Sequence, residues 1–213
     1  MSLVRDTIYA FVGLKRLVSF QDNWRECFDV SADGVLRSFW AAALAIPVFV
    51  YVGAGFAHMG AELGAARPPS RLWLDIVEYA RIWLVFPIVA ALISLYFSRS
   101  AFLSVWLVVH NWAVLALFSI QAIVVTLYLS GVLPMGAALA FFVLPYHFIR
   151  LGLHWRVATA SLNISWGAGA AAASLHVIVD LLAITALAVL STPSEPAPAE
   201  SQSSEIVIPV SSE

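Results

Sequence analysis

The chain has 213 residues, of which 62% are hydrophobic and only 11% are charged. A soluble domain usually carries about 25% charged residues, so the sequence has too little polar surface for a water-soluble globule and favours lipid as its solvent. The net charge of −2 gives no sign of nucleic-acid binding. The single cysteine, Cys27, excludes an intramolecular disulfide and a cysteine-based metal site.

Residues 1–38 are predicted to be a cytoplasmic segment that contains an amphipathic helix. On a helix over residues 4–18, one side is mainly apolar and the other mainly polar. The apolar side gathers Val4, Ile8, Phe11, Val12, Leu14 and Val18, and the polar side gathers Arg5, Asp6, Tyr9 and Arg16. Such a helix either lies in the membrane interface or packs against the bundle, and the sequence leaves both open. Ser31 is then placed to cap a further short helix.

Residues 39–190 are predicted to be a transmembrane domain with five helical spans. The spans are expected at about 39–56, 82–97, 101–129, 137–150 and 166–190. Residues 57–78 form a loop, and Arg71 to Arg81 is expected to be a short interfacial helix before the second span. The third span exceeds the roughly 20 residues needed to cross a bilayer. We interpret it as one tilted or protruding helix, because no turn residues interrupt it.

Residues 191–213 differ in composition from the rest of the chain. They read S-T-P-S-E-P-A-P-A-E-S-Q-S-S-E-I-V-I-P-V-S-S-E, which is rich in Pro, Ser, Ala and Glu and has no basic residue. Such a composition cannot bury enough apolar surface to form a core. It predicts a disordered acidic tail on the side of the membrane opposite to the N-terminus.

The basic residues predict the orientation of the five spans. Eight fall on the side of the N-terminus: Arg5, Lys15, Arg16, Arg25, Arg37, Arg99, Arg150 and Arg156. Three fall on the other side: Arg67, Arg71 and Arg81. Because cytoplasmic loops are enriched in positive charge, we expect a cytoplasmic N-terminus and an extracytoplasmic tail.

The fifth span has an aspartate near its middle, Asp180, and His176 lies one helical turn before it. An aspartate at the centre of a bilayer costs about 3 kcal/mol on insertion scales. Asp180 should therefore face the interior of the bundle and find a partner there. The candidate partners in spans three and four are His110, Asn111, Gln121, His147 and Arg150, and His154 follows at i+4 from Arg150.

These residues form a candidate intramembrane polar site with three interpretations: Asp180, His176, His110, Asn111, Gln121, His147 and Arg150. In the first, they hydrogen-bond one another and fix the register of the helices. In the second, they relay protons or hold a cation. The third is a metal site of two imidazoles and one carboxylate. The sequence has no H-E-x-x-H or comparable ligand spacing, so neither a metal nor a cofactor is predicted.

Residues 167–174, G-A-G-A-A-A-A-S, form a run of small residues in the fifth span. Small residues allow helices to approach closely in a membrane. This face packs either within the bundle or against a partner, which would be a second copy or another membrane protein. Apart from that, the lipid bilayer is the only partner that the sequence predicts.

Catalytic motifs are absent from the sequence. It contains no G-x-S-x-G, no phosphate-binding glycine loop, no H-E-x-x-H and no dinucleotide fingerprint. No nucleophile and base are paired in a recognisable way. We therefore predict that the protein is not an enzyme.

The layout over residues 28–190 resembles the Yip1-like family of five-span membrane proteins. F-D-V-S-A-D-G at 28–34 stands where eukaryotic members carry a D-L-x-G-P-type motif, without its proline. The longer stretch F-D-V-S-A-D-G-V-L-R-S-F-W is similar to uncharacterised alphaproteobacterial membrane proteins, and the single lysine among many Ala, Arg and Trp residues is typical of a high-GC bacterium. The resemblance implies a multi-pass protein of the bacterial inner membrane and brings no catalytic or binding residues with it.

The sequence thus predicts an all-α, polytopic bundle with an N-terminal amphipathic helix and a disordered tail. Its first predicted function is that of a Yip1-like membrane organiser or scaffold. The alternative is a small transporter, channel or proton-coupled component that uses the Asp/His polar site. A polar cavity that reaches Asp180 would favour transport, and a dry, close-packed interior would favour a scaffold.

Overall fold

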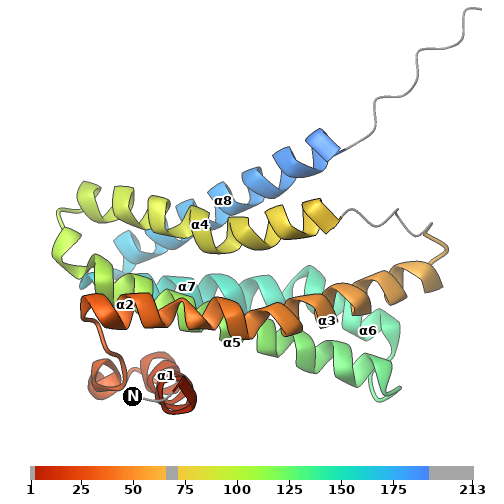
Figure 1. Cartoon of the computed structure of the whole chain (residues 1–213), viewed down its shortest axis with the longest axis horizontal. Coiled ribbons are helices and arrows are strands. Elements are labelled where there is room, and N and C mark those ends of the chain that lie inside the picture. The colour runs from red at the N-terminus through yellow and green to blue at the C-terminus, as the bar shows by residue number, and fades with distance from the viewer. Residues whose placement is uncertain (1–2, 66–71, 192–213) are drawn as a thin grey trace, which may run out of the picture.

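The computed structural model describes residues 3–65 and 72–191, and all regular structure in them is helical (Figure 1). Five helical stretches are long and apolar enough to cross a membrane: Ala32–Glu62, Leu72–Tyr96, Ser100–Leu129, Met135–Leu162 and Trp166–Leu187. This confirms the all-α fold with five spans, and the chain is a multi-pass membrane protein by architecture. The predicted disorder of the tail falls on residues 192–213, outside the described part of the chain.

The helices follow one another along the chain with short connections. They are α1 (Leu3–Val18), α2 (Ala32–Ser38), α3 (Trp40–Glu62), α4 (Leu72–Tyr96), α5 (Leu103–Leu129), α6 (Met135–Val143), α7 (Pro145–Leu162) and α8 (Trp166–Ser191). Two short 3₁₀ helices, η1 (Asp22–Cys27) and η2 (Ser100–Phe102), lie between them. The long helices run side by side along the bundle in Figure 1, and α1 is seen nearly end-on at one end of it.

Helix α1 combines the two arrangements that the sequence leaves open. One face of it, with Ala10, Gly13, Leu14 and Leu17, is buried and packs on α5 and α7. Of the predicted apolar side only Leu14 belongs to this face, and its other members are exposed, with Val4 69% accessible. An exposed apolar side on a helix that lies across the end of the bundle is typical of a membrane interface (Figure 1).

The F-D-V-S-A-D-G stretch forms the turn that starts α2. The Ser31 hydroxyl accepts a hydrogen bond from the backbone N–H of Gly34 at 3.1 Å, which is the predicted N-cap. Asp29 accepts one from the backbone N–H of Ser31 and pairs with Arg37, which also contacts Asp6 of α1. The hydrogen bonds from Ser31 hold the pKa of Asp29 below its usual range, with help from Arg37. These contacts join α1 to the start of the first span.

Three predicted boundaries differ from the structure. The loop expected over 57–78 is helical as far as Glu62, the last residue of α3, and again from Leu72, the first residue of α4. The expected interfacial helix over 71–81 and the second span form a single helix, α4. The fourth span, expected at 137–150, is divided into α6 and α7 and continues to Leu162. The break lies at Leu144, which precedes Pro145 and has φ −130° and ψ −57°. A residue before proline is restricted in the helical region, and proline fits the first turn of a new helix.

Helix α5 is the central element of the bundle. It packs against α1, α2, α3, α4, α6 and α7, while α8 packs against α7 and α4. Eight of its buried side chains belong to the larger apolar core, namely Val105, Trp106, Val108, Val109 and the four from Trp112 to Leu115, and Val124, Val125 and Tyr128 belong to a second, smaller core near α6. The single helix expected for the third span is present. The α5 residues between these two cores include Leu117, Phe118 and Gln121, which face the cavity described below.

The small residues of α8 allow a close approach to α7. Gly169, Ala172 and Ala173 are buried. A Cβ added at Gly169 would lie 1.9 Å from Thr159 Oγ1 and 3.1 Å from Thr159 Cα, so only glycine fits there. Gly167, Ala170 and Ala171 are exposed. The small-residue run is therefore used in part within the bundle.

Candidate functional site

Asp180 faces the interior of the bundle, where two arginines share its carboxylate. Arg81 of α4 donates to Oδ1, and Arg150 of α7 donates to Oδ2. The side chains of Arg81, Arg150 and Asp180 are 9%, 15% and 10% exposed. This cluster connects α4, α7 and α8, and Arg150 is the partner that the sequence nominates.

The pairing of Asp180 with both Arg81 and Arg150 argues against the proton relay that is one interpretation of its sequence position. Proton uptake by its carboxyl would remove the one carboxylate that pairs with both guanidinium groups inside the membrane domain, which is strongly unfavourable. Asp180 is therefore poorly suited to relay protons. We interpret it as the counter-ion that fixes the two arginines in place.

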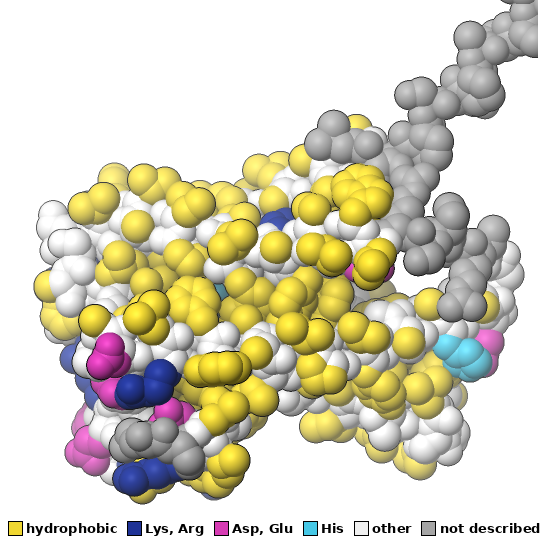
Figure 2. Space-filling model, in the orientation of Figure 1, with side chains coloured by type: hydrophobic (Ala, Val, Ile, Leu, Met, Phe, Trp, Pro, Cys, Tyr) yellow, Lys and Arg dark blue, Asp and Glu magenta, His cyan; other side chains and the backbone are white. Residues whose placement is uncertain are grey.

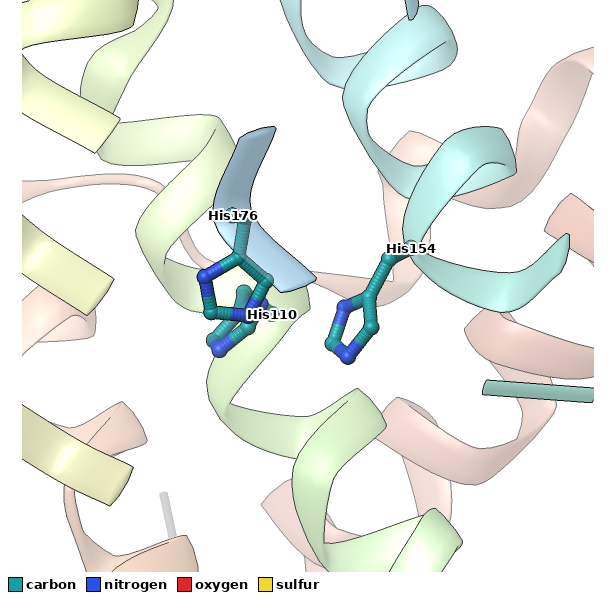
Figure 3. Close-up of side chains that lie close together, drawn as sticks. All are labelled: His110, His154 and His176. Carbon is teal, nitrogen blue, oxygen red and sulfur yellow. The ribbon is translucent and has the colours of Figure 1, made fainter. Parts of the chain in front are cut away.

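Three histidines gather beside this cluster, one from each of three helices (Figure 3). His110 of α5, His154 of α7 and His176 of α8 are all buried. The centroids of their rings lie 5.0 Å apart for His110 and His154, 5.2 Å for His110 and His176, and 4.9 Å for His154 and His176. Each ring has one nitrogen within 4.8 Å of the corresponding nitrogens of the other two. His110 and His176 lie at the same depth, as their positions in the spans suggest.

The histidines and the Arg81–Asp180–Arg150 cluster line a cavity of about 900 Å³. Its exposed lining residues include Val50, Gly53 and Ala54 of α3 and Leu72 and Asp75 of α4. The buried lining residues come from α3, α5, α7 and α8. The cavity thus opens between exposed residues of α3 and of the start of α4. A volume of this size is typical of a small-molecule site.

The walls of the cavity are apolar, and three of its five charged residues follow one side of α4. Phe49, Val52, Leu117 and Phe118 are among the wall residues. Asp75, Glu78 and Arg81 lie three residues apart on α4, so they share one face of that helix and lead from the rim to Asp180. The charged lining residues are three carboxylates and two guanidiniums, which gives a formal charge of −1.

The outer surface agrees with a membrane-embedded bundle. In Figure 2 hydrophobic side chains cover most of the visible face, while Lys, Arg, Asp and Glu gather at the end that carries α1. Exposed apolar residues in the spans include Leu84, Ile88 and Leu92 of α4, each more than 60% accessible. Such a surface is compatible with lipid and not with water.

The remaining predicted site residues take different places. Asn111 donates to Ser38 Oγ at 2.9 Å and joins α5 to α2, away from the cavity. Gln121 is half-buried and His147 is exposed, and both line the cavity. The structure thus brings Asp180, His176, His110, Gln121, His147 and Arg150 to one cavity and places Asn111 elsewhere.

Two residues of the site are missing from the sequence-based set. The first is His154, which belongs to the histidine cluster. It lies four residues after Arg150, so the sequence already placed both side chains on one face of a helix. Arg81 was assigned to the interface because the apolar run of the second span begins after it. The sequence feature that could have identified Arg81 is its spacing of three residues from Glu78 and six from Asp75. This spacing places the three charged side chains on one face of a helix.

No known protein family, no curated protein and no solved structure matches this chain.

Proposed function

We propose that the protein is a small membrane transporter or channel for a cation. The observation that carries this proposal is the cavity of about 900 Å³ that reaches from exposed residues of α3 and α4 to the buried histidines and Asp180. A scaffold has no need of such a cavity, because empty space in a bundle forfeits packing contacts. Polar and ionisable side chains inside a membrane domain are costly and commonly mark a solute path.

The charge of the cavity supports a cation over an anion. Asp75 and Glu78 stand on the way in, and the whole lining has a formal charge of −1. Carboxylates along a path of low dielectric attract cations and repel anions. The two arginines do not reverse this, because both are paired with Asp180. In this proposal the residues bind and pass a solute and catalyse no reaction.

Flux through the cavity is tested by filling it. Gly53 lines the cavity, and a Cβ added there has no atom within 4 Å, so Gly53→Trp starts a large side chain at the cavity wall without a clash at its Cβ. The protein is reconstituted in liposomes with a trapped pH dye or a trapped Zn²⁺ dye, and proton and zinc entry are followed. We expect flux in the wild type and a loss of at least fivefold in Gly53→Trp.

The matched control is Gly136→Trp. Gly136 of α6 is also exposed and has no atom within 4 Å of an added Cβ, but it does not line the cavity. This variant should keep the flux of the wild type. Absence of proton and zinc flux in the wild type, or equal flux in both tryptophan variants, would contradict the proposal.

The orientation proposed for this protein is a cytoplasmic N-terminus in a bacterial inner membrane. Arg81 and Arg150 lie inside the bundle and count for neither side, and Arg67 and Arg71 fall outside the described residues. Support comes from Lys15, Arg16, Arg25 and Arg37, which lie in or next to α1 and α2. Reporter fusions before α1 and in the loop between α5 and α6 test the proposal, which requires a cytoplasmic signal from the first fusion and an extracytoplasmic signal from the second.

A Yip1-like scaffold is the second candidate function. The observation that favours it is the exposed apolar side of α1, with Val4 and Ile8 more than half accessible, since such a surface can hold a membrane partner or the bilayer interface. A scaffold should tolerate Gly53→Trp and lose its associated membrane proteins with Ile8→Glu. Quantitative co-purification of the two variants from native membranes distinguishes this candidate from a transporter.

A further inference from the structure

The three histidines of the cavity have the ring spacing of a metal site. Their centroids form a nearly equilateral triangle with sides of 4.9, 5.0 and 5.2 Å. A tetrahedral zinc ion with Zn–N bonds of about 2.0–2.1 Å holds its imidazole rings with their centres roughly 5 Å apart. The ring centres therefore stand at about the separation of a zinc site, and a bound ion would draw the ligand nitrogens, which now lie within 4.8 Å of one another, closer together.

Two of these rings carry nitrogen atoms that nothing in the described chain satisfies. Nδ1 of His110 and Nδ1 of His176 are buried and have no hydrogen-bond partner. A buried polar atom without a partner costs about 1–3 kcal/mol. Two such atoms in one cluster point to a ligand that supplies the missing interactions.

The chemistry of the cluster selects the kind of ligand. Imidazole nitrogen suits zinc, copper, iron and nickel, whereas magnesium and calcium prefer oxygen ligands. Three protein ligands leave a fourth position of a tetrahedral ion open. Because all three histidines line the cavity, that position faces the space through which a solute arrives.

The charges around the histidines act in both directions: Arg150 and Arg81 disfavour a cation there, and the three carboxylates of the lining favour one and bring its formal charge to −1. Asp180 lies one helical turn after His176 and is the counter-ion of Arg81 and Arg150. Asp75 and Glu78 place negative charge on the way in. The alternative is that the rings only pack together, as Phe86 does by stacking on His110, but packing leaves the two Nδ1 atoms unsatisfied.

We propose that His110, His154 and His176 form a binding site for one divalent first-row transition-metal ion, of which zinc is the best fit, with its open coordination position facing the cavity. The site lies in the cavity of the proposed transport path. It does not depend on transport, since a metal held there would equally serve as a fixed cofactor. Bound metal and flux are therefore measured separately, so that either proposal can fail alone.

The test uses the full-length chain, purified in detergent with an affinity tag that contains no histidine. The protein is stripped with a chelator, equilibrated with Zn²⁺ and desalted, and its metal content is measured by mass spectrometry. We expect about one zinc per chain. Replacement of zinc by Co²⁺ should give the intense visible absorption of a tetrahedral cobalt site with nitrogen ligands.

Variants then assign the ligands. His110→Gln, His154→Gln and His176→Gln should each weaken zinc binding by tenfold or more, because one of three protein ligands is lost. His58→Gln is the matched control, since His58 is an exposed histidine at the outer end of α3 that pairs with Glu62. It should bind zinc like the wild type.

The wild-type protein alone keeps the proposal testable if the variants fail to fold. Zinc should raise its melting temperature in detergent, and cobalt should show the tetrahedral spectrum. Less than a tenth of an equivalent of zinc, an octahedral cobalt spectrum, or binding that is lost in His58→Gln and kept in the three cavity variants would overturn the proposal. Bound zinc without flux would leave this site standing and contradict the transporter.

Discussion

At the scale of single residues, the ion cluster around Asp180 is the feature with the clearest consequence. The carboxylate of Asp180 forms a salt bridge with both Arg81 and Arg150. The cluster therefore has one negative charge for two positive charges. Asp180→Asn leaves two unpaired guanidiniums inside the membrane domain, while Arg81→Gln leaves one complete pair of Arg150 and Asp180. Breaking a buried pair costs about 3–5 kcal/mol, so we expect Asp180→Asn to be the more destabilising substitution by at least 2 kcal/mol.

Thermal unfolding of both variants in the same detergent measures this difference. A drop of the melting temperature that is larger in Asp180→Asn supports the role of Asp180 as shared counter-ion. If Asp180→Asn were as stable as the wild type while Arg81→Gln unfolded early, the pairing would be wrong.

The polar residues of the site differ in how far the sequence could predict them. Asp180 and His176 stood out because they share one face of an apolar helix and one of them is acidic. His154 and Arg81 did not, because they sit near the ends of hydropathy windows, where a polar residue is ordinary. Asn111 looked like a site residue, but the small α2 helix placed Ser38 against it. Only tertiary packing separates these cases.

At the scale of elements, the contact of α7 with α8 depends on the absence of a side chain at Gly169. Gly169→Ala would place a Cβ 1.9 Å from Thr159 Oγ1 and 3.1 Å from Thr159 Cα, so the two helices must separate. Overpacking of this kind costs about 1–3 kcal/mol. Gly167→Ala, two residues earlier in the same helix, meets no atom within 4 Å and should be neutral or stabilising. Melting temperatures that fall equally in both variants would refute the close approach.

The junction of α1 and α2 should respond to pH through Asp29. Its pKa in the folded chain lies below that of the unfolded chain. The carboxylate therefore contributes stability that is fully present above the unfolded value, about 3.9, and is lost as the pH falls through the lower folded value. Hydrogen exchange of the first turn of α2, corrected for its intrinsic pH dependence, should rise over this acid range.

Asp29→Asn is the control for that measurement. Asparagine still accepts the hydrogen bonds from Ser31 but cannot lose a charge, so the first turn of α2 should show no step in its exchange over the same range. A step of equal size in Asp29→Asn would assign the effect to another group.

Sequence periodicity predicted the elements better than their ends. The third and fifth spans are uninterrupted apolar runs between turn residues, and α5 and α8 follow them closely. Helix α4 begins ten residues before the expected span, because Asp75, Glu78 and Arg81 face the cavity and not lipid. The fourth span is divided at Pro145, which is the first residue of α7. A proline can either end a helix or begin a new one, and the sequence alone does not decide between these.

At the scale of the whole molecule, a helical bundle that faces lipid contains two apolar cores and, beside them, a cavity that charged residues and histidines reach. The two apolar cores lie at different heights of α5, and the cavity runs along α5 from His110, at the level of the larger core, to Gln121. Composition alone predicted the solvent of the protein, because 11% charged residues cannot cover a soluble fold. Composition could not predict the cavity, because a cavity depends on how the helices pack against one another in three dimensions.

Solvent access to this cavity is measured by cysteine labelling in a Cys27→Ser background. Val114 and Val109 are both buried residues of α5 in the larger apolar core, but Val114 also lines the cavity and Val109 does not. A cationic, membrane-impermeant thiol reagent added to the reconstituted protein should modify Val114→Cys at least tenfold faster than Val109→Cys, because only the first is reached through a hydrated path. Equal protection of both cysteines would mean that the interior is dry, and it would contradict the central claim of a solute cavity in the membrane domain.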